Sequence, residues 1–159
     1  MIRAATKSVD DTRALAAEIA ALAAPGDLVV LAGDLGTGKT AFAQGFARGL
    51  GVKEPVTSPA FILVRTYEGR LPLIHLDVYR LDQMQELVDL GIAELLDDGG
   101  VTLVEWGDAV TPGLPADFLE VRLDAGESPD DRTLTVRSVG PSWPPRAHAL
   151  RLALTPWTV

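Results

Sequence analysis

The feature that most constrains the fold of this chain is the stretch from Leu28 to Thr40, which reads LVVLAGDLGTGKT. Its apolar start, 28–31, predicts a short buried strand. Residues 33–40 then form a complete G-x-x-x-x-G-K-[ST] pattern. A helical pattern with apolar residues at four-residue spacing follows from Phe42 to Leu50. A strand, a glycine-rich loop and a helix in this order predict a phosphate-binding loop.

The residue types in this loop suit phosphate chemistry. Backbone N–H groups must converge on phosphate oxygens, and the glycines at 33, 36 and 38 leave room for them. The N-terminus of the following helix adds unpaired donors and a partial positive charge. Lys39 is predicted to neutralise the β- and γ-phosphates, and the Thr40 hydroxyl to hold Mg²⁺. A glycine turn that merely precedes a lysine is the simpler alternative, and the strand and helix around the motif argue against it.

Length and composition predict one globular domain. The chain has 159 residues, of which 47% are apolar and 23% charged. We expect a single P-loop domain over 1–140 and a proline-rich tail over 141–159 that packs on it or is partly mobile. No apolar run approaches the length of a membrane span, and the start lacks the apolar core of a signal peptide, so we expect a cytoplasmic protein without membrane contact. The lack of cysteine excludes disulfides and thiolate metal sites.

The charge balance bears on the choice of partner. The chain carries 14 basic and 22 acidic residues, a formal net charge of −8 at pH 7, and its basic residues do not cluster. Proteins that grip nucleic acid by themselves usually present a basic face. The sequence therefore argues against tight direct binding of RNA or DNA, unless a partner supplies the positive surface.

Hydrophobic patterning predicts an α/β fold, a P-loop type sheet flanked by helices with antiparallel strand additions. Besides the strand before the loop, we expect strands at 2–6, 61–67, 71–78, 101–106, 118–123 and 133–139, the second and third of them forming a hairpin. Besides the helix after the loop, we expect a helix from the capping-box spacing at Ser8 to about Pro25, two short pieces within 84–96, and one over 146–154. The polar link 124–132 is expected to be mobile.

Two acidic residues are candidates for the acid that orients a metal or its water in a P-loop nucleotidase. Glu105 follows the apolar run 101–104, the pattern of a Walker B acid. Asp77 follows the run 73–76 and precedes Tyr79 and Arg80. An acid at the end of a strand can also cap a loop or pair with Arg80, and spacing alone does not choose between the two candidates.

Four further residues have simpler readings from sequence alone. We expect Trp106 to pack in the core or at an interface. His75 is expected to be a satisfied core histidine or an alternating strand position. Asp34, an acid inside a phosphate loop, is expected to point away and make a loop hydrogen bond. Arg132 reads as a solvated arginine that starts a strand, although it could reach a phosphate.

The chain resembles the TsaE (YjeE) family, the P-loop ATPases of bacterial tRNA threonylcarbamoyladenosine synthesis. Four blocks in order carry the resemblance: GDLGTGKT at 33–40, TSPAF at 57–61, HLDVYR at 75–80 and VEW at 104–106. The order and spacing of the last three behind a phosphate loop are specific, although each is a weak signal by itself. The resemblance runs from about Val9 to Val139.

The resemblance implies a set of site residues. Lys39, Asp77 and Glu105 would be catalytic, and Thr40 and Glu105 would hold Mg²⁺, with Trp106 beside the site. ATP or ADP would be bound by the phosphate loop, by the pair Asp11 and Thr12 near the adenine, and by Arg132. The loop residues in this set are Gly36, Thr37, Gly38, Lys39, Thr40 and Ala41.

The resemblance also implies a role. Such a protein is a slow Mg²⁺-dependent ATPase that joins the TsaD–TsaB pair, and it meets tRNA only indirectly, through these partners. The family usually reads Ser-Pro-Thr in a switch-like loop, and here Ala60 follows Ser58 and Pro59. The alanine in place of threonine puts ATP turnover in question, but not ATP binding. A nucleotide-gated module without significant turnover is therefore one alternative. A small-molecule P-loop kinase is the other, against which the acidic link 124–132 with its single arginine argues.

Overall fold

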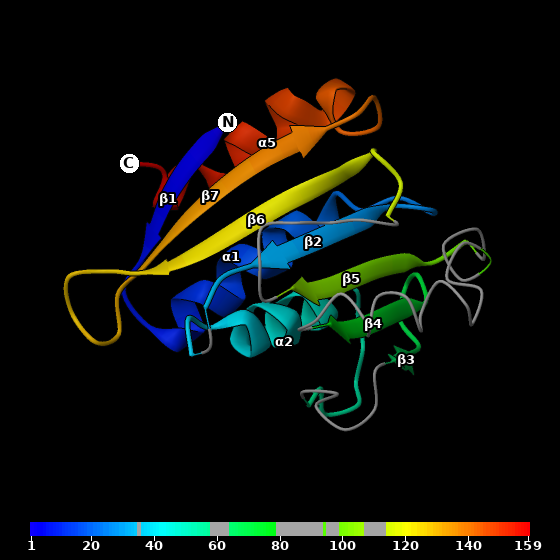
Figure 1. Ribbon diagram of the computed structural model, residues 1–159, viewed down its shortest axis with the longest axis horizontal. Helices are drawn as coiled ribbons and strands as arrows, with labels where there is room; N and C mark the ends of the chain where they lie inside the picture. The colour runs from blue at the N-terminus through cyan, green and yellow to red at the C-terminus, as the bar shows by residue number, and fades with distance from the viewer. Residues whose placement is uncertain (35, 58–63, 79–93, 95–98, 107–113) are drawn as a thin grey trace.

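The computed structural model describes residues 1–34, 36–57, 64–78, 94, 99–106 and 114–159. Its centre is a seven-stranded sheet in the order β1-β7-β6-β2-β5-β4-β3 (Figure 1). The strands are β1 (Ile2–Thr6), β2 (Leu28–Ala32), β3 (Val64–Tyr67), β4 (Leu73–Val78), β5 (Val101–Trp106), β6 (Phe118–Ala125) and β7 (Arg132–Val139).

Strand direction divides the sheet into a parallel centre and antiparallel edges. β6, β2, β5 and β4 run parallel to one another, so their carboxyl ends meet at one edge, on the left in Figure 1. β7 and β1 are added antiparallel on one side and β3 on the other. The predicted fold class, an α/β sheet with antiparallel additions, is confirmed.

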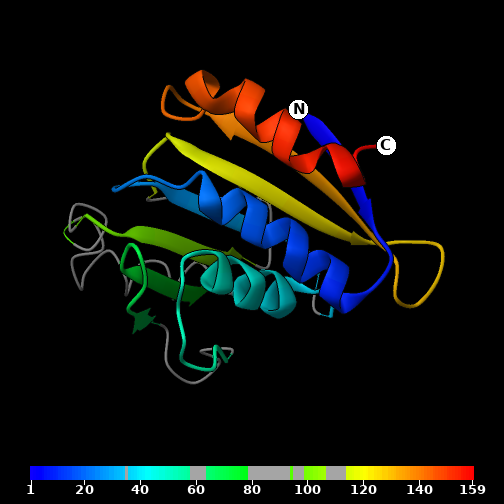
Figure 2. The same cartoon turned by 180° about the vertical axis from the view of Figure 1, so that it is seen from behind.

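Within the described part of the chain, three helices cover one face of the sheet (Figure 2): α1 (Val9–Ala21), α2 (Lys39–Gly49) and α5 (Ala147–Leu154). α1 and α2 pack very closely, because α2 presents glycines to α1. A Cβ added at Gly49 would lie 2.6 Å from the carbonyl oxygen of Ala17, and one at Gly45 would meet the backbone of Arg13 even more closely. Among the described residues, no helix is long and apolar enough to cross a bilayer.

The start of α1 follows the predicted capping pattern with one difference. The Ser8 side chain accepts a hydrogen bond from the Asp11 N–H at 3.0 Å. The Asp11 carboxylate accepts a hydrogen bond from the N–H of Lys7, at 3.0 Å, rather than from that of Ser8. Both contacts satisfy donors at the start of the helix.

Several predicted boundaries differ from the structure. The hairpin of β3 and β4 is present, but residues 61–63, which we expected in its first strand, lie outside the described residues. The expected helical pieces within 84–96 also lie outside them, apart from Glu94. β6 and β7 extend further into the link 124–132 than predicted, because their ladder continues to the pair Ala125 and Arg132. A hydrogen bond from the Gly126 N–H to the Asp131 carbonyl closes the turn.

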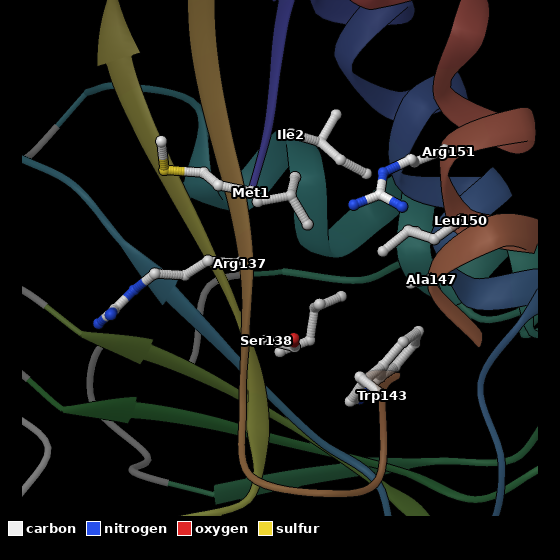
Figure 3. Close-up of a pocket in the computed structure, with 10 residues that line it drawn as sticks. Met1, Ile2, Arg137, Ser138, Trp143, Ala147, Leu150 and Arg151 are labelled. Atoms are coloured by element: carbon white, nitrogen blue, oxygen red, sulfur yellow. The ribbon is translucent and has the colours of Figure 1, made fainter. Parts of the chain in front are cut away.

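Residues 141–159 fold back over the sheet. Within this segment, the 3₁₀ turn Pro144–Arg146 leads into α5, and the 3₁₀ turn Thr155–Trp157 follows it. Trp143, Leu150 and Leu154 belong to the same apolar core as α1 and α2. A cavity of about 60 Å³ separates α5 from β1 and β7 (Figure 3), far smaller than the several hundred Å³ that a nucleotide-sized ligand needs.

Arg146 anchors this segment to the body of the protein. Its guanidinium forms two hydrogen bonds, of 2.6 and 2.9 Å, with the carboxylate of Asp27, whose side chain is almost completely buried. We expect Arg146→Ala to lower the free energy of unfolding by about 2–3 kcal/mol, because the substitution leaves a buried carboxylate without its cation. Urea unfolding of the variant measures the effect.

Arg137→Ala is the matched control. The hydrogen bonds and charge of Glu120 raise the pKa of Arg137, but half of the Arg137 side chain is exposed, so solvent screens the pair. We expect a change below about 1 kcal/mol in this variant. Equal effects of the two substitutions would contradict the anchoring role of Arg146.

Candidate nucleotide-binding site

The phosphate loop leaves β2 at the carboxyl edge of the parallel strands and ends where α2 begins. All five residues of β2 are buried, which fixes the start of the loop. Gly33 and Gly38 have φ angles of 151° and 100°, in a region that side chains disfavour. A Cβ at Gly33 would also lie 2.6 Å from the Leu123 carbonyl oxygen. The loop therefore needs glycine at both positions for its conformation, and at Gly33 also for space.

Two polar side chains of the loop, those of Lys39 and Thr37, turn inward onto its backbone. Lys39 is buried, and its Nζ donates a hydrogen bond to the Gly33 carbonyl at 2.8 Å. The Thr37 hydroxyl donates to the Asp34 carbonyl at 2.7 Å. The Asp34 side chain is exposed, as predicted, but the loop hydrogen bonds use its carbonyl oxygen rather than its carboxylate.

Arg132 lies against the phosphate loop, although it is more than ninety residues away in sequence. Its Nε donates to the Thr37 carbonyl at 3.0 Å, and one Nη approaches the Gly36 carbonyl at 3.4 Å. The other Nη donates to the carbonyls of Pro129 and Asp131 in its own turn. Arg132 does begin β7, as residue patterns predicted, but the expectation of a solvated side chain is wrong, because the β6–β7 turn brings it onto the loop.

The two candidate acids are direct neighbours in the sheet. Asp77 of β4 pairs in register with Glu105 of β5, and Glu105 pairs with Leu31 of β2. Residues in register share a face of the sheet, and Leu31 belongs to the core on the side of the helices. Both acids therefore lie on the face that α2 covers, near the end where the phosphate loop begins. Both are buried, with at most 2% of either residue exposed.

Glu105 has the chemistry of a cation ligand. Its Oε1 is buried and has no hydrogen-bond partner among the described residues. An unpaired buried carboxylate oxygen is costly unless a cation or donor meets it. The described part of the chain contains no cluster of three or more His, Cys, Asp or Glu side chains that could hold a metal by itself. Mg²⁺ does not need one, because it takes one or two protein ligands together with phosphates and water.

His75 lies next to Glu105, a neighbour that the sequence analysis missed. The ring is completely buried, and its Nε2 is 3.6 Å from Glu105 Oε2. Its predicted burial is confirmed, but a satisfied core histidine is not what the structure contains, since neither ring nitrogen is hydrogen-bonded to any described residue. The sequence did contain a signal for this position. His75 and Asp77 are two residues apart in one strand, so their side chains lie on the same face of the sheet.

Asp11 and Thr12 lie at the start of α1, on the other side of the phosphate loop. The hydroxyl oxygens of Thr12 and Thr6 are 2.7 Å apart, and Thr6 pairs in register with Arg132 of β7. Asp11 accepts a hydrogen bond of 2.6 Å from the indole N–H of Trp157. No pattern in the sequence indicated this last contact, which joins positions 146 residues apart.

The predicted site residues thus fall on two sides of one loop. Asp77 and Glu105 lie toward β5 and β4, while Arg132, Asp11 and Thr12 lie toward β7 and β1. Thr40 and Ala41 lie in the first turn of α2. The switch-like segment 58–60 and the Trp106 side chain lie outside the described residues.

Comparisons with known proteins identify the family to which this chain is similar. The family model of the threonylcarbamoyl adenosine biosynthesis protein TsaE matches residues 6–134. The chain is 44% identical to the tRNA threonylcarbamoyladenosine biosynthesis protein TsaE of Bacillus subtilis over 137 residues, which cover 85% of this chain and 84% of the relative. It is 40% identical to the protein of that name from Streptomyces coelicolor, over 82% of this chain and 93% of the relative.

The fold matches a solved structure along nearly its whole length. The crystal structure of Bacillus subtilis YdiB superimposes with a TM-score of 0.76 at 37% identity, covering 98% of this chain and 97% of the other. The family model and the relatives each cover most of the sequence, and the structural match extends over the remainder. By sequence and by fold, this chain belongs to the TsaE family, whose named members are proteins of threonylcarbamoyladenosine biosynthesis in tRNA.

Proposed function

We propose that this chain is a Mg²⁺-dependent ATP-binding protein with slow ATPase activity, which acts in the cytoplasm as an accessory subunit of the TsaD–TsaB complex in the threonylcarbamoyladenosine modification of tRNA. The observation that supports it most is the position of a buried, incompletely paired Glu105 beside a complete phosphate loop. A P-loop nucleotidase needs these two parts together.

The proposal gives each residue of the loop a task. The N–H groups from Gly36 to Ala41 and the Lys39 ammonium group bind the phosphates, and the inward position of Lys39 means that the cation is already desolvated in the loop. The Thr40 hydroxyl and Glu105 hold Mg²⁺, which when bound neutralises charge on the β- and γ-phosphates. Asp77, adjacent to Glu105, acts as the second acid and orients the attacking water.

Arg132 is proposed to add positive charge on the side of the loop opposite the acids. We expect Arg132→Ala to weaken ATP binding about tenfold, because a guanidinium beside a phosphate contributes a charge-assisted hydrogen bond of about 1.5 kcal/mol. Arg132→Lys should recover part of this loss, since it keeps the charge but not the planar donors. Calorimetric titration with ATP measures both.

Arg65→Ala serves as the control, because Arg65 is exposed on β3 at the far edge of the sheet. Its ATP affinity should equal that of the wild type. An unchanged affinity in Arg132→Ala would leave Arg132 with a purely structural role in the turn.

The acidic charge of the chain supports an indirect relation to tRNA. With a net charge of −8, the chain is poorly suited to grip a polyanion alone. In the proposal, TsaD and TsaB hold the tRNA, and this subunit binds them and cycles ATP. Ala60 in the switch-like segment is the one feature that favours the alternative of a nucleotide-gated module.

Hydrolysis measurements test the proposal. The purified protein is assayed with ATP and Mg²⁺, alone and with the TsaD–TsaB pair. A slow rate that rises with the partners is the expected result. ATP binding without hydrolysis under both conditions would favour the nucleotide-gated module, and absence of ATP binding would refute the proposal.

A further inference from the structure

The last residues of the chain return to the start of α1. Trp157 ends the second 3₁₀ turn, and its Nε1 donates a hydrogen bond of 2.6 Å to Asp11 Oδ1. The residues after it are held to β1: Thr158 forms a bridge with Ala4, and the Val159 N–H donates to the Arg3 carbonyl at 3.0 Å. The indole is therefore held by its bond to Asp11 and by the backbone contacts of the two residues that follow it.

The Asp11 carboxylate has one donor on each oxygen. Oδ2 accepts from the Lys7 N–H, as described above, and Oδ1 accepts from Trp157. The carboxylate of an aspartate in the first turn of a helix can otherwise rotate about its side-chain torsions. With both oxygens bound, the carboxylate is held in one orientation, and Trp157 supplies the contact that is distant in sequence.

The order of strands indicates on which side of the phosphate loop Asp11 lies. In the proposed function, Thr40 and Glu105 would hold Mg²⁺ on the side of the loop toward β5 and β4, where the metal would neutralise charge on the terminal phosphates. With the terminal phosphates on that side, the ribose and base of the nucleotide would lie on the opposite side of the loop, toward β7. Three features lie on that side: Arg132, Asp11, and the ion pair between Lys7 and Asp131, whose charged atoms are 3.5 Å apart.

We propose that Trp157 is a positioning residue for the nucleoside half of the site, acting through Asp11. This inference rests on the proposed function. It assigns a role to a segment beyond residue 134, where the match to the family model ends.

Trp157→Phe tests the inference, because it keeps an aromatic ring and removes the N–H. We expect ATP affinity, measured by calorimetry in Mg²⁺, to fall about fivefold, the equivalent of one hydrogen bond. The affinity for inorganic tripolyphosphate, which has no nucleoside, should stay unchanged. If Trp157 only stabilised the fold, its substitution would not change the affinity for ATP differently from the affinity for tripolyphosphate.

Trp143→Phe is the matched control. Trp143 is buried, and its indole N–H has no hydrogen-bond partner in the described part of the chain, so the same substitution removes no such bond. Its affinity for ATP should equal that of the wild type.

A double-mutant cycle tests whether Trp157 acts through Asp11. In an Asp11→Ala background, Trp157→Phe should cause no further loss of ATP affinity. A full fivefold loss in that background would overturn the inference, as would unchanged ATP affinity in Trp157→Phe or an equal loss for ATP and tripolyphosphate. A wild-type protein that binds neither ligand would refute the proposed function itself, so the two failures are distinguishable.

Discussion

Lys39→Ala is expected to lower the affinity of the protein for ATP by about 100-fold or more, the cost of removing one partner from a buried charge pair. The structure gives the reason. The Lys39 ammonium group is buried inside the loop, 2.8 Å from the Gly33 carbonyl, so it meets a phosphate without first leaving water. Calorimetric titration with ATP and with ADP measures the loss, and ATP hydrolysis should disappear with it.

Lys53→Ala is the control for this experiment. The chain has lysine only at positions 7, 39 and 53, and Lys53 is exposed after α2, outside the loop. Its substitution removes the same charge and should leave ATP affinity unchanged. If Lys39→Ala bound ATP as tightly as the wild type, the assignment of the phosphate loop would be wrong.

Glu105→Gln is expected to separate binding from turnover. The amide keeps the shape of the side chain but removes the charge that would hold Mg²⁺, so we expect hydrolysis in Mg²⁺ to fall about 100-fold or more. Binding of ATP without Mg²⁺ should change by less than about threefold, within 1 kcal/mol, because Lys39 and the loop are intact. Steady-state hydrolysis and metal-free titration give the two values.

Measurements of stability test whether that loss of hydrolysis comes only from unfolding of the Glu105→Gln variant. Because Oε1 of Glu105 is buried and has no partner among the described residues, replacing the carboxylate should leave the unfolding temperature of the metal-free protein unchanged or raise it. Glu18→Gln, an exposed change on α1, controls for the substitution. Wild-type turnover in Glu105→Gln would transfer the metal role to Asp77.

Local sequence patterns were sufficient for much of the fold. Short apolar runs predicted β1 and β5 to the residue and β2 to within one residue. The phosphate loop was recognisable because its chemistry requires glycines and a lysine at fixed positions. The ends of strands were less predictable. The ladder of β6 and β7 continues beyond the residues that alternate between apolar and polar, because backbone hydrogen bonds pair Asp124 and Ala125 with β7 whatever their side chains.

The candidate site depends more on contacts between distant segments. Sequence could not choose between Asp77 and Glu105, because both follow apolar strands that end at the same edge of the sheet. The structure explains why the patterns were so similar: the two residues are register neighbours. Arg132 and Trp157 could not be placed from residue patterns, because their positions follow from the β6–β7 turn and from the path of residues 141–159 over the sheet.

The path of those last residues has a consequence for solubility. β1 is an edge strand of the sheet, and the unpaired backbone groups of an edge invite another chain to add to it. Thr158 and Val159 occupy part of that edge through their contacts with Ala4 and Arg3. The segment that carries Trp157 to Asp11 therefore also blocks sheet growth between molecules, so loss of its docking would favour aggregation.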